Sequence, residues 1–193
     1  MKVLGITGGV GSGKSEVLHY LEKEYKAVVC QLDEVAKELQ KQGGICYQKI
    51  IEAFGTGILG EDRELDRQKL ASIIFRDEEK RKILNEIVHP EVKRWVERDM
   101  IEKEERKVPL YVIEAALLPE AGYEDICPEL WYIYAREDVR RKRLKDSRGY
   151  SDEKISRMMA AQSSEDVFRQ ACRTVIDNSG TFEDTKKQIG ERI

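Results

Sequence analysis

The 193-residue sequence has no excess of charge of one sign, no long apolar run and no closely spaced cysteine pair. Its 34 basic and 37 acidic residues leave a net charge of −3, which argues against the basic surface that nucleic-acid binding requires. The apolar run near the N-terminus stops at Gly8, too early for a secretion signal or a membrane span. We therefore expect a cytoplasmic protein with neither a nucleic-acid nor a membrane partner.

Cysteines and aromatic residues are also few. The four cysteines, Cys30, Cys46, Cys127 and Cys172, lack metal-ligand spacing, so a reducing environment accounts for them most simply. Aromatic residues make up only 7% of the chain and charged residues 37%, a balance that favours solvated helices over an all-β sandwich. The length suits an α/β protein with an insertion, and we expect residues 1–193 to form a single domain.

The stretch Gly8–Ser15 matches the phosphate-loop pattern G-x-x-x-x-G-K-[ST] at every fixed position. A predicted strand precedes it and a predicted amphipathic helix follows, which is the context that this motif requires. In such a loop the backbone N–H groups surround phosphates, the lysine reaches the terminal phosphates and the hydroxyl binds Mg²⁺. We therefore expect a nucleoside triphosphate at Gly8, Gly9, Gly11, Ser12, Gly13, Lys14, Ser15 and Glu16, with Ser15 as the metal ligand.

Short apolar runs recur between helical segments, which is typical of a parallel sheet covered by helices. The predicted strands are Val3–Thr7, Ala27–Leu32, Leu110–Glu114, Leu130–Tyr134 and Thr174–Ile176. We therefore predict an α/β fold with a parallel five-stranded core, made of residues 1–35 and 108–193.

The intervening residues, about 36–107, are predicted to be a helical insertion that ends in a long charged helix over Glu91–Lys107. Glycines at 43–44 and 55–60 interrupt its helices. Two interpretations stand: the insertion binds the second substrate, or it is a structural buttress without a ligand.

The guanine-binding pattern Asn-Lys-x-Asp is missing, which disfavours a GTPase. Phosphoryl transfer to a hydroxyl acceptor also requires a carboxylate that accepts the hydroxyl proton. Asp33 follows the second predicted strand, and strand carboxyl ends face the ligand crevice in open α/β sheets. Its position fits a general base and fits equally well an N-cap of a helix over Glu34–Gln40.

A basic run over Arg136–Arg148 precedes a turn at Gly149, and Ser151 is predicted to cap the next helix. Half of these side chains are expected on solvated helix faces. The two helices also suit a lid over about 140–160 that brings Arg140, Arg143 or Arg148 to the transferred phosphoryl group.

Several separately spaced patterns resemble those of the dephospho-coenzyme A kinases, nearly from end to end. They are Thr7–Ser15, Leu65-Asp66-Arg67, Leu70, Ile74-Phe75, Leu84-Asn85, His89-Pro90, Met158–Gln162 and Val175–Gly180. The resemblance implies a P-loop kinase in which ATP phosphorylates the ribose 3′-hydroxyl of dephospho-coenzyme A, the last step of coenzyme A synthesis. We expect a monomer or a weak homo-oligomer.

The resemblance also implies a role for each matching residue. Lys14 and Ser15 hold the phosphates and Mg²⁺, Asp33 is the general base, Arg67 and His89 contact the acceptor, Arg143 is a lid arginine, and Asn178 lies near the adenine.

The chain departs from the family pattern at several points: Glu16, Gln31, Ala116–Glu120, Ser147 and Thr174. Gln31 leaves one carboxylate where the family has two, and Ser147 stands where the second lid arginine is usual. Two other functions therefore stay open: another small-metabolite or nucleoside kinase, and a nucleotide-binding protein without transferase activity.

Overall fold

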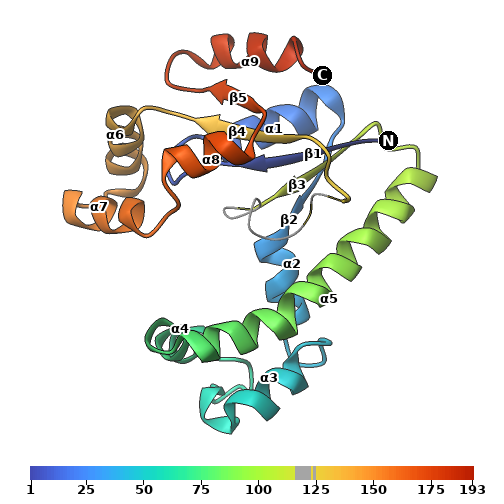
Figure 1. Ribbon diagram of the computed structural model, residues 1–193, viewed down its shortest axis with the longest axis vertical. Coiled ribbons are helices and arrows are strands. Elements are labelled where there is room, and N and C mark those ends of the chain that lie inside the picture. Colours follow the sequence, from blue (N-terminus) through green and yellow to red (C-terminus); the bar gives the residue numbers. More distant parts are fainter. Residues whose placement is uncertain (116–122, 124) are drawn as a thin grey trace. The chain divides into compact units, whose positions relative to one another are not determined.

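A computed structural model describes residues 1–115, 123 and 125–193 (Figure 1). The chain forms two compact units, one of Met1–Cys30 with Lys103–Ile193 and the other of Gln31–Glu102. The family-like pattern at Ala116–Glu120 lies outside the described residues. Within the described part of the chain, no helix has the length and apolar character to cross a membrane.

A five-stranded sheet with the order β2-β3-β1-β4-β5 is the centre of the first unit. Its strands are β1 (Lys2–Thr7), β2 (Val28–Gln31), β3 (Leu110–Glu114), β4 (Leu130–Tyr134) and β5 (Thr174–Asp177). The central strand β1 pairs in parallel with β3, where Gly5 lies opposite Ile113, and with β4, where Gly5 lies opposite Leu130. The predicted five strands and their parallel sheet are confirmed, with bounds within two residues of those expected.

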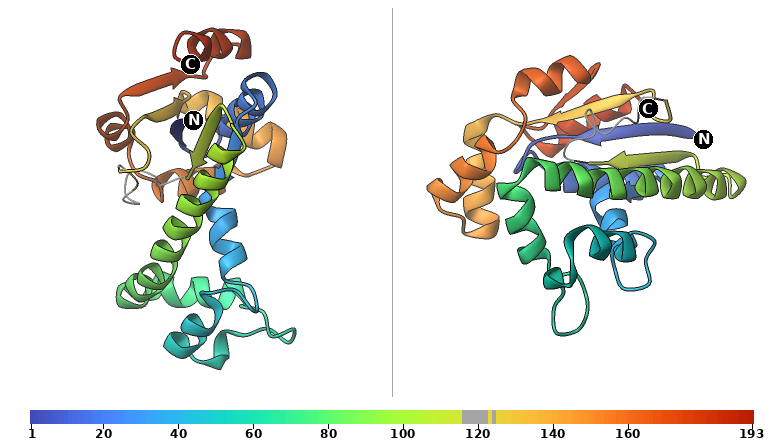
Figure 2. Two further views of the ribbon diagram at one scale, coloured as in Figure 1. Left: turned by 90° about the vertical axis from the view of Figure 1, so that its right-hand side faces the viewer. Right: turned by 60° about the horizontal axis from the view of Figure 1, so that its bottom comes forward.

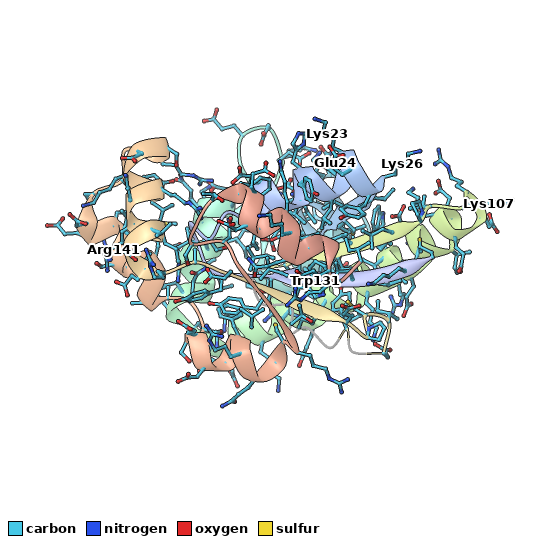
Figure 3. The ribbon with its side chains drawn as sticks, turned by 90° about the horizontal axis from the view of Figure 1, so that it is seen from above. Lys23, Glu24, Lys26, Lys107, Trp131 and Arg141 are labelled. Atoms are coloured by element: carbon cyan, nitrogen blue, oxygen red, sulfur yellow. The ribbon has the colours of Figure 1, made fainter. Side chains whose placement is uncertain are left out.

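The alternation of side chains along β4 produces a hydrophobic core on each face of the sheet. Trp131 (Figure 3) and Ile133 are fully buried with the apolar side chains of α1 (Lys14–Tyr25) and α9 (Phe182–Gly190). Tyr132 faces the other way and stacks on Phe168 of α8 (Glu165–Ala171), with ring centroids 4.9 Å apart. The sheet is thus covered on both faces, as its short apolar strands predict.

Helices α6 (Glu137–Arg148) and α7 (Asp152–Ala160) lie side by side in the views of Figures 1 and 2. Gly149 ends α6 with φ 61°, and the Ser151 side chain accepts the backbone N–H of Lys154 to cap α7, as predicted. Arg141 (Figure 3) joins the pair by donating from Nη1 to Ser156 Oγ at 3.0 Å.

The second unit is helical, as predicted for residues 36–107. It contains α2 (Leu32–Leu39), α3 (Tyr47–Phe54), a 3₁₀ turn η1 (Thr56–Ile58), α4 (Arg67–Arg76) and most of α5 (Glu78–Glu105). The Asp66 side chain caps α4 by accepting the backbone N–H groups of Gln68 and Lys69. Lys49 of α3 reaches Glu91 of α5 at 3.0 Å, so these two helices are linked by an ion pair.

The prediction that the long helix begins at Glu91 was wrong, because α5 runs through Pro90 without a break. Proline has no N–H, so in a helix it removes one hydrogen bond, here to the carbonyl of Glu86. An apolar stripe spans the proline and keeps the helix continuous by burial. Its buried members, four residues apart, are Leu84, Val88, Val92 and Val96.

The N-cap interpretation of Asp33 was also wrong. Helix α2 begins at Leu32 with Gln31 as its N-cap, so Asp33 lies inside the first turn. There its carboxylate is exposed and is free of the capping role that the sequence left open.

Candidate active site

The loop Gly8–Ser15 joins β1 to α1, and two of its glycines adopt left-handed backbone conformations, with φ 77° at Gly11 and φ 88° at Gly13. A Cβ atom at Gly13 would lie 2.2 Å from Asn178 Nδ2, and one at Gly9 would lie 2.6 Å from Arg140 Nη2. At Gly13 both the backbone conformation and the buried Asn178 amide therefore require glycine, whereas at Gly9 a Cβ would meet the end of the Arg140 side chain.

Arg140 of α6 holds the first half of the loop. Its Nε donates to the carbonyl of Val10 at 2.8 Å, and its Nη2 donates to Gln162 Oε1 at 3.3 Å. The same Gln162 oxygen accepts the N–H of Val10 at 2.9 Å. The residue predicted to close as a lid arginine is thus bonded to the loop's main chain.

Arg143 and Asn178 hold the second half of the loop. Asn178 Nδ2 donates to the carbonyl of Ser12 at 2.8 Å, and Arg143 Nη1 donates to the same oxygen at 3.2 Å. Arg143 Nη2 then donates to the carbonyl of Asn178 at 2.9 Å, which closes the arrangement. Arg148, the third predicted lid arginine, is exposed and interacts with Tyr150, whose pKa it lowers by hydrogen bonding.

These contacts set the direction of the loop's N–H groups. In a trans peptide the C=O and N–H bonds point in opposite directions, and the chain has no cis peptide bond in its described part. Donors that hold the carbonyls of Val10 and Ser12 therefore turn the N–H groups of Gly11 and Gly13 the other way. N–H groups converging on one side are what a phosphate-binding loop needs.

The lysine of the loop is paired with a glutamate that the sequence reasoning missed. Lys14 Nζ lies 2.5 Å from Glu114 Oε1, with the two side chains 18% and 13% exposed. Glu114 ends β3, next to β1 in the sheet, so it lies at the same sheet edge as the loop. An acidic residue at the end of a predicted strand was the signal available for it.

The oxygen atoms near Lys14 suit Mg²⁺. Ser15 is exposed at the start of α1, and the Glu114 carboxylate contacts the neighbouring lysine. Hydroxyl and carboxylate oxygens are the ligands that Mg²⁺ prefers, with the rest of its shell taken from water and phosphates. Among the described residues no group of three or more His, Cys, Asp or Glu side chains could hold a metal by itself.

In the second unit, Arg67 begins α4, and its Nη2 donates to the carbonyl of Lys37 at 3.4 Å. Arg67 is therefore held against α2, the helix that carries Asp33. The charge of Arg67 also contributes to the lowered pKa of Glu34, after the larger effect of the hydrogen bond from Lys37. A cation thus lies close to the first turn of α2.

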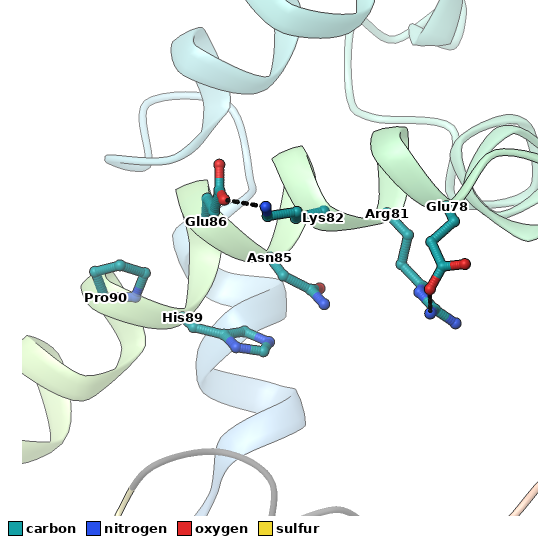
Figure 4. Close-up of a pocket in the computed structure, with 7 residues that line it drawn as sticks. All are labelled: Glu78, Arg81, Lys82, Asn85, Glu86, His89 and Pro90. Carbon is teal, nitrogen blue, oxygen red and sulfur yellow. Dashed lines mark hydrogen bonds and ion pairs between the residues drawn. The ribbon is translucent and has the colours of Figure 1, made fainter.

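His89 lies in a hollow of about 510 Å³ along α5, which is also lined by Glu78, Arg81, Lys82, Asn85, Glu86 and Pro90 (Figure 4). Arg81, Asn85 and His89 are four residues apart and point to the same side of the helix in Figure 4. Arg67 is not among its lining residues.

Comparisons with known proteins show the family to which the chain belongs. The family model described as dephospho-CoA kinase matches residues 2–184. A dephospho-CoA kinase of Carboxydothermus hydrogenoformans is 37% identical over 190 residues, which cover 98% of this chain and 91% of that protein.

Two solved structures share the fold. The Thermus thermophilus protein TT1252 has a TM-score of 0.81 and 30% identity, covering 98% of this chain and 95% of its own. The Campylobacter jejuni dephospho-CoA kinase has a TM-score of 0.70 and 21% identity, covering 99% and 95%, and supports the fold alone.

A parallel sheet whose first strand leads into a complete phosphate loop defines a P-loop nucleotide-binding protein. With a family model that spans nearly the whole sequence, the chain belongs to the dephospho-CoA kinase family.

Proposed function

We propose that this protein transfers the γ-phosphoryl group of ATP to the ribose 3′-hydroxyl of dephospho-CoA, which completes coenzyme A synthesis. The observation that carries the proposal is the match of residues 2–184 to the family model, in a chain that keeps a fully formed phosphate loop. Its departures at Glu16, Gln31 and Ser147 leave the contacts of the loop carbonyls in place.

On the ATP side, the loop N–H groups and Lys14 bind the β- and γ-phosphates. Ser15 would hold Mg²⁺, which when bound neutralises charge on the phosphates. Glu114 keeps Lys14 close to the loop before ATP enters and releases it to the phosphates. Arg143 stiffens the loop through Ser12 and Asn178, so its contribution in this structure is positioning.

On the acceptor side, Asp33 receives the proton of the attacking hydroxyl, and Arg67 supplies a positive charge beside the same helix. His89 binds dephospho-CoA in the hollow along α5, where Arg81 and Asn85 offer further donors. These groups suit a substrate with a diphosphate, hydroxyls and amides.

The function is tested with an assay that couples ADP release to a dehydrogenase. The assay is run with ATP and dephospho-CoA, and with ATP and other hydroxyl acceptors for comparison. We expect turnover with dephospho-CoA, and phosphorylation of another acceptor alone would contradict the proposal. Asp33→Asn should lower kcat by about a hundredfold or more and leave ATP binding unchanged, since only proton acceptance is lost. Glu34→Gln, one residue along the same turn, is the control and should keep its activity.

We also propose a cytoplasmic enzyme that acts as a monomer or a weak homo-oligomer. All four cysteines are buried and none forms a disulfide bond, and burial raises the pKa of Cys127 to about 12 and that of Cys172 to about 11. Cysteines that form no disulfide are typical of reducing compartments. Sedimentation of the purified protein measures the oligomeric state directly.

A further inference from the structure

Asn178, after β5, is fully buried, and all of its polar groups are engaged. Its N–H donates to the carbonyl of Tyr134 at 2.8 Å, and its carbonyl accepts Arg143 Nη2 at 2.9 Å. Its side-chain Nδ2 donates to the carbonyl of Ser12 at 2.8 Å, and its Oδ1 accepts the hydroxyl of Thr185 at 2.8 Å. Asn178 therefore connects the phosphate loop to the helix α9.

The orientation of this amide follows from its partners. The carbonyl of Ser12 can only accept, so the NH₂ group must face it and Oδ1 must face α9. Thr185, which is also fully buried, supplies the matching donor. The other oxygens near this hydroxyl, the carbonyls of Asp177 and Thr181, are farther away at 3.5 Å.

The direction of one loop N–H depends on the two donors to the Ser12 carbonyl, which are this amide at 2.8 Å and Arg143 Nη1 at 3.2 Å. Because the peptide between Ser12 and Gly13 is trans, a donor on the Ser12 carbonyl turns the Gly13 N–H away from Asn178. If the amide turned over, Oδ1 would face the Ser12 carbonyl oxygen and two acceptors would repel each other. The Ser12 carbonyl would then keep only the longer bond from Arg143, and the Gly13 N–H would be held less firmly in its direction.

We propose that Thr185 is a positioning residue for the phosphates of ATP. Its hydroxyl fixes the amide of Asn178, and the amide fixes the Ser12–Gly13 peptide of the loop. The inference rests on the assignment of Gly8–Ser15 to the phosphates of ATP. It does not depend on which group accepts the proton in the reaction.

The experiment compares Thr185→Val, which removes the hydroxyl and keeps the shape, with Thr185→Ser, which keeps the hydroxyl. Thr181→Val is the matched control, because Thr181 caps α9 through Asp184 without bonding the side chain of Asn178. Dissociation constants for Mg-ATP and for Mg-tripolyphosphate are measured by calorimetry without acceptor. Thermal unfolding of each variant is measured as well. If Thr185→Val does not fold, Thr185→Ala takes its place.

We expect Thr185→Val to weaken both ligands by about tenfold, the size expected when a buried acceptor loses its donor. Thr185→Ser should stay within about twofold of the unmodified protein. Thr181→Val should lower the Tm and leave both dissociation constants unchanged. The KM for dephospho-CoA should also be unaffected in every variant.

A double variant tests whether Thr185 acts through Asn178. In an Asn178→Ala background, Thr185→Val should cause no further loss of ATP affinity, since the amide that it orients is gone. Weaker ATP binding with unchanged tripolyphosphate binding would overturn the inference, because the effect would then lie at the base. Equal losses in Thr181→Val and Thr185→Val would overturn it too, since general loosening of α9 would account for both.

Discussion

Lys14 Nζ and Glu114 Oε1 lie 2.5 Å apart, so the lysine of the phosphate loop is neutralised by a strand-end carboxylate before any phosphate binds. Both side chains are mostly buried, which strengthens their attraction relative to a pair in water. An incoming phosphate must compete with this carboxylate and is also repelled by it.

Glu114→Gln should therefore bind metal-free ATP more tightly. The loss of one partly buried ion pair is worth about 1 kcal/mol, or about fivefold in the dissociation constant. Calorimetry in the presence of a chelator measures the change. The control is Glu129→Gln, a half-buried glutamate of the same unit, which pairs with Lys2. Unchanged or weaker ATP binding in Glu114→Gln would mean that the pair does not compete with phosphate.

His89→Ala should raise the KM for dephospho-CoA by about tenfold with little change in the KM for ATP, because a donor to a polar or charged substrate group is removed. Initial rates at varied acceptor concentration measure the effect. The other histidine of the chain, His19, is exposed on α1, and His19→Ala should behave like the unmodified protein. Equal KM values for dephospho-CoA in both variants would remove His89 from the acceptor site.

The helical unit should lose stability in acid through Glu91. This buried carboxylate accepts hydrogen bonds from Arg94 at 2.7 Å and from Lys49 at 3.0 Å, which lower its pKa below the ordinary 4.5. A carboxyl whose folded pKa is lowered stabilises the fold above its unfolded pKa, and the contribution is lost as the pH falls through the folded value. Protonation also breaks both ion pairs.

Glu91→Gln should therefore lower the free energy of unfolding by about 1–2 kcal/mol at pH 7, since both cations are half-exposed. The difference from the unmodified protein should shrink below about pH 4.5 and close once Glu91 is protonated. Urea denaturation at several pH values measures it. A difference that does not depend on pH would show that charge is not the source of the effect.

Local sequence signals were sufficient for most of the fold. Short apolar runs predicted all five strands, because strands of a parallel sheet are buried on both faces and need continuous apolar residues. The loop glycines and the cap at Ser151 could also be predicted from the sequence. Each meets a conformational or hydrogen-bonding requirement of its own turn. Pro90 misled the prediction because the burial of α5 outweighs one missing hydrogen bond.

The sequence by itself determined the phosphate loop, the sheet and the helical insertion, because these depend on residues close together in the chain. Only the tertiary structure decided which side chains hold that loop. Arg143 and Asn178 are more than a hundred residues from Ser12 in the chain, yet both donate to its carbonyl. Glu114 likewise reaches Lys14 only because β3 lies next to β1. Such contacts depend on strand order and helix packing, which no local pattern specifies.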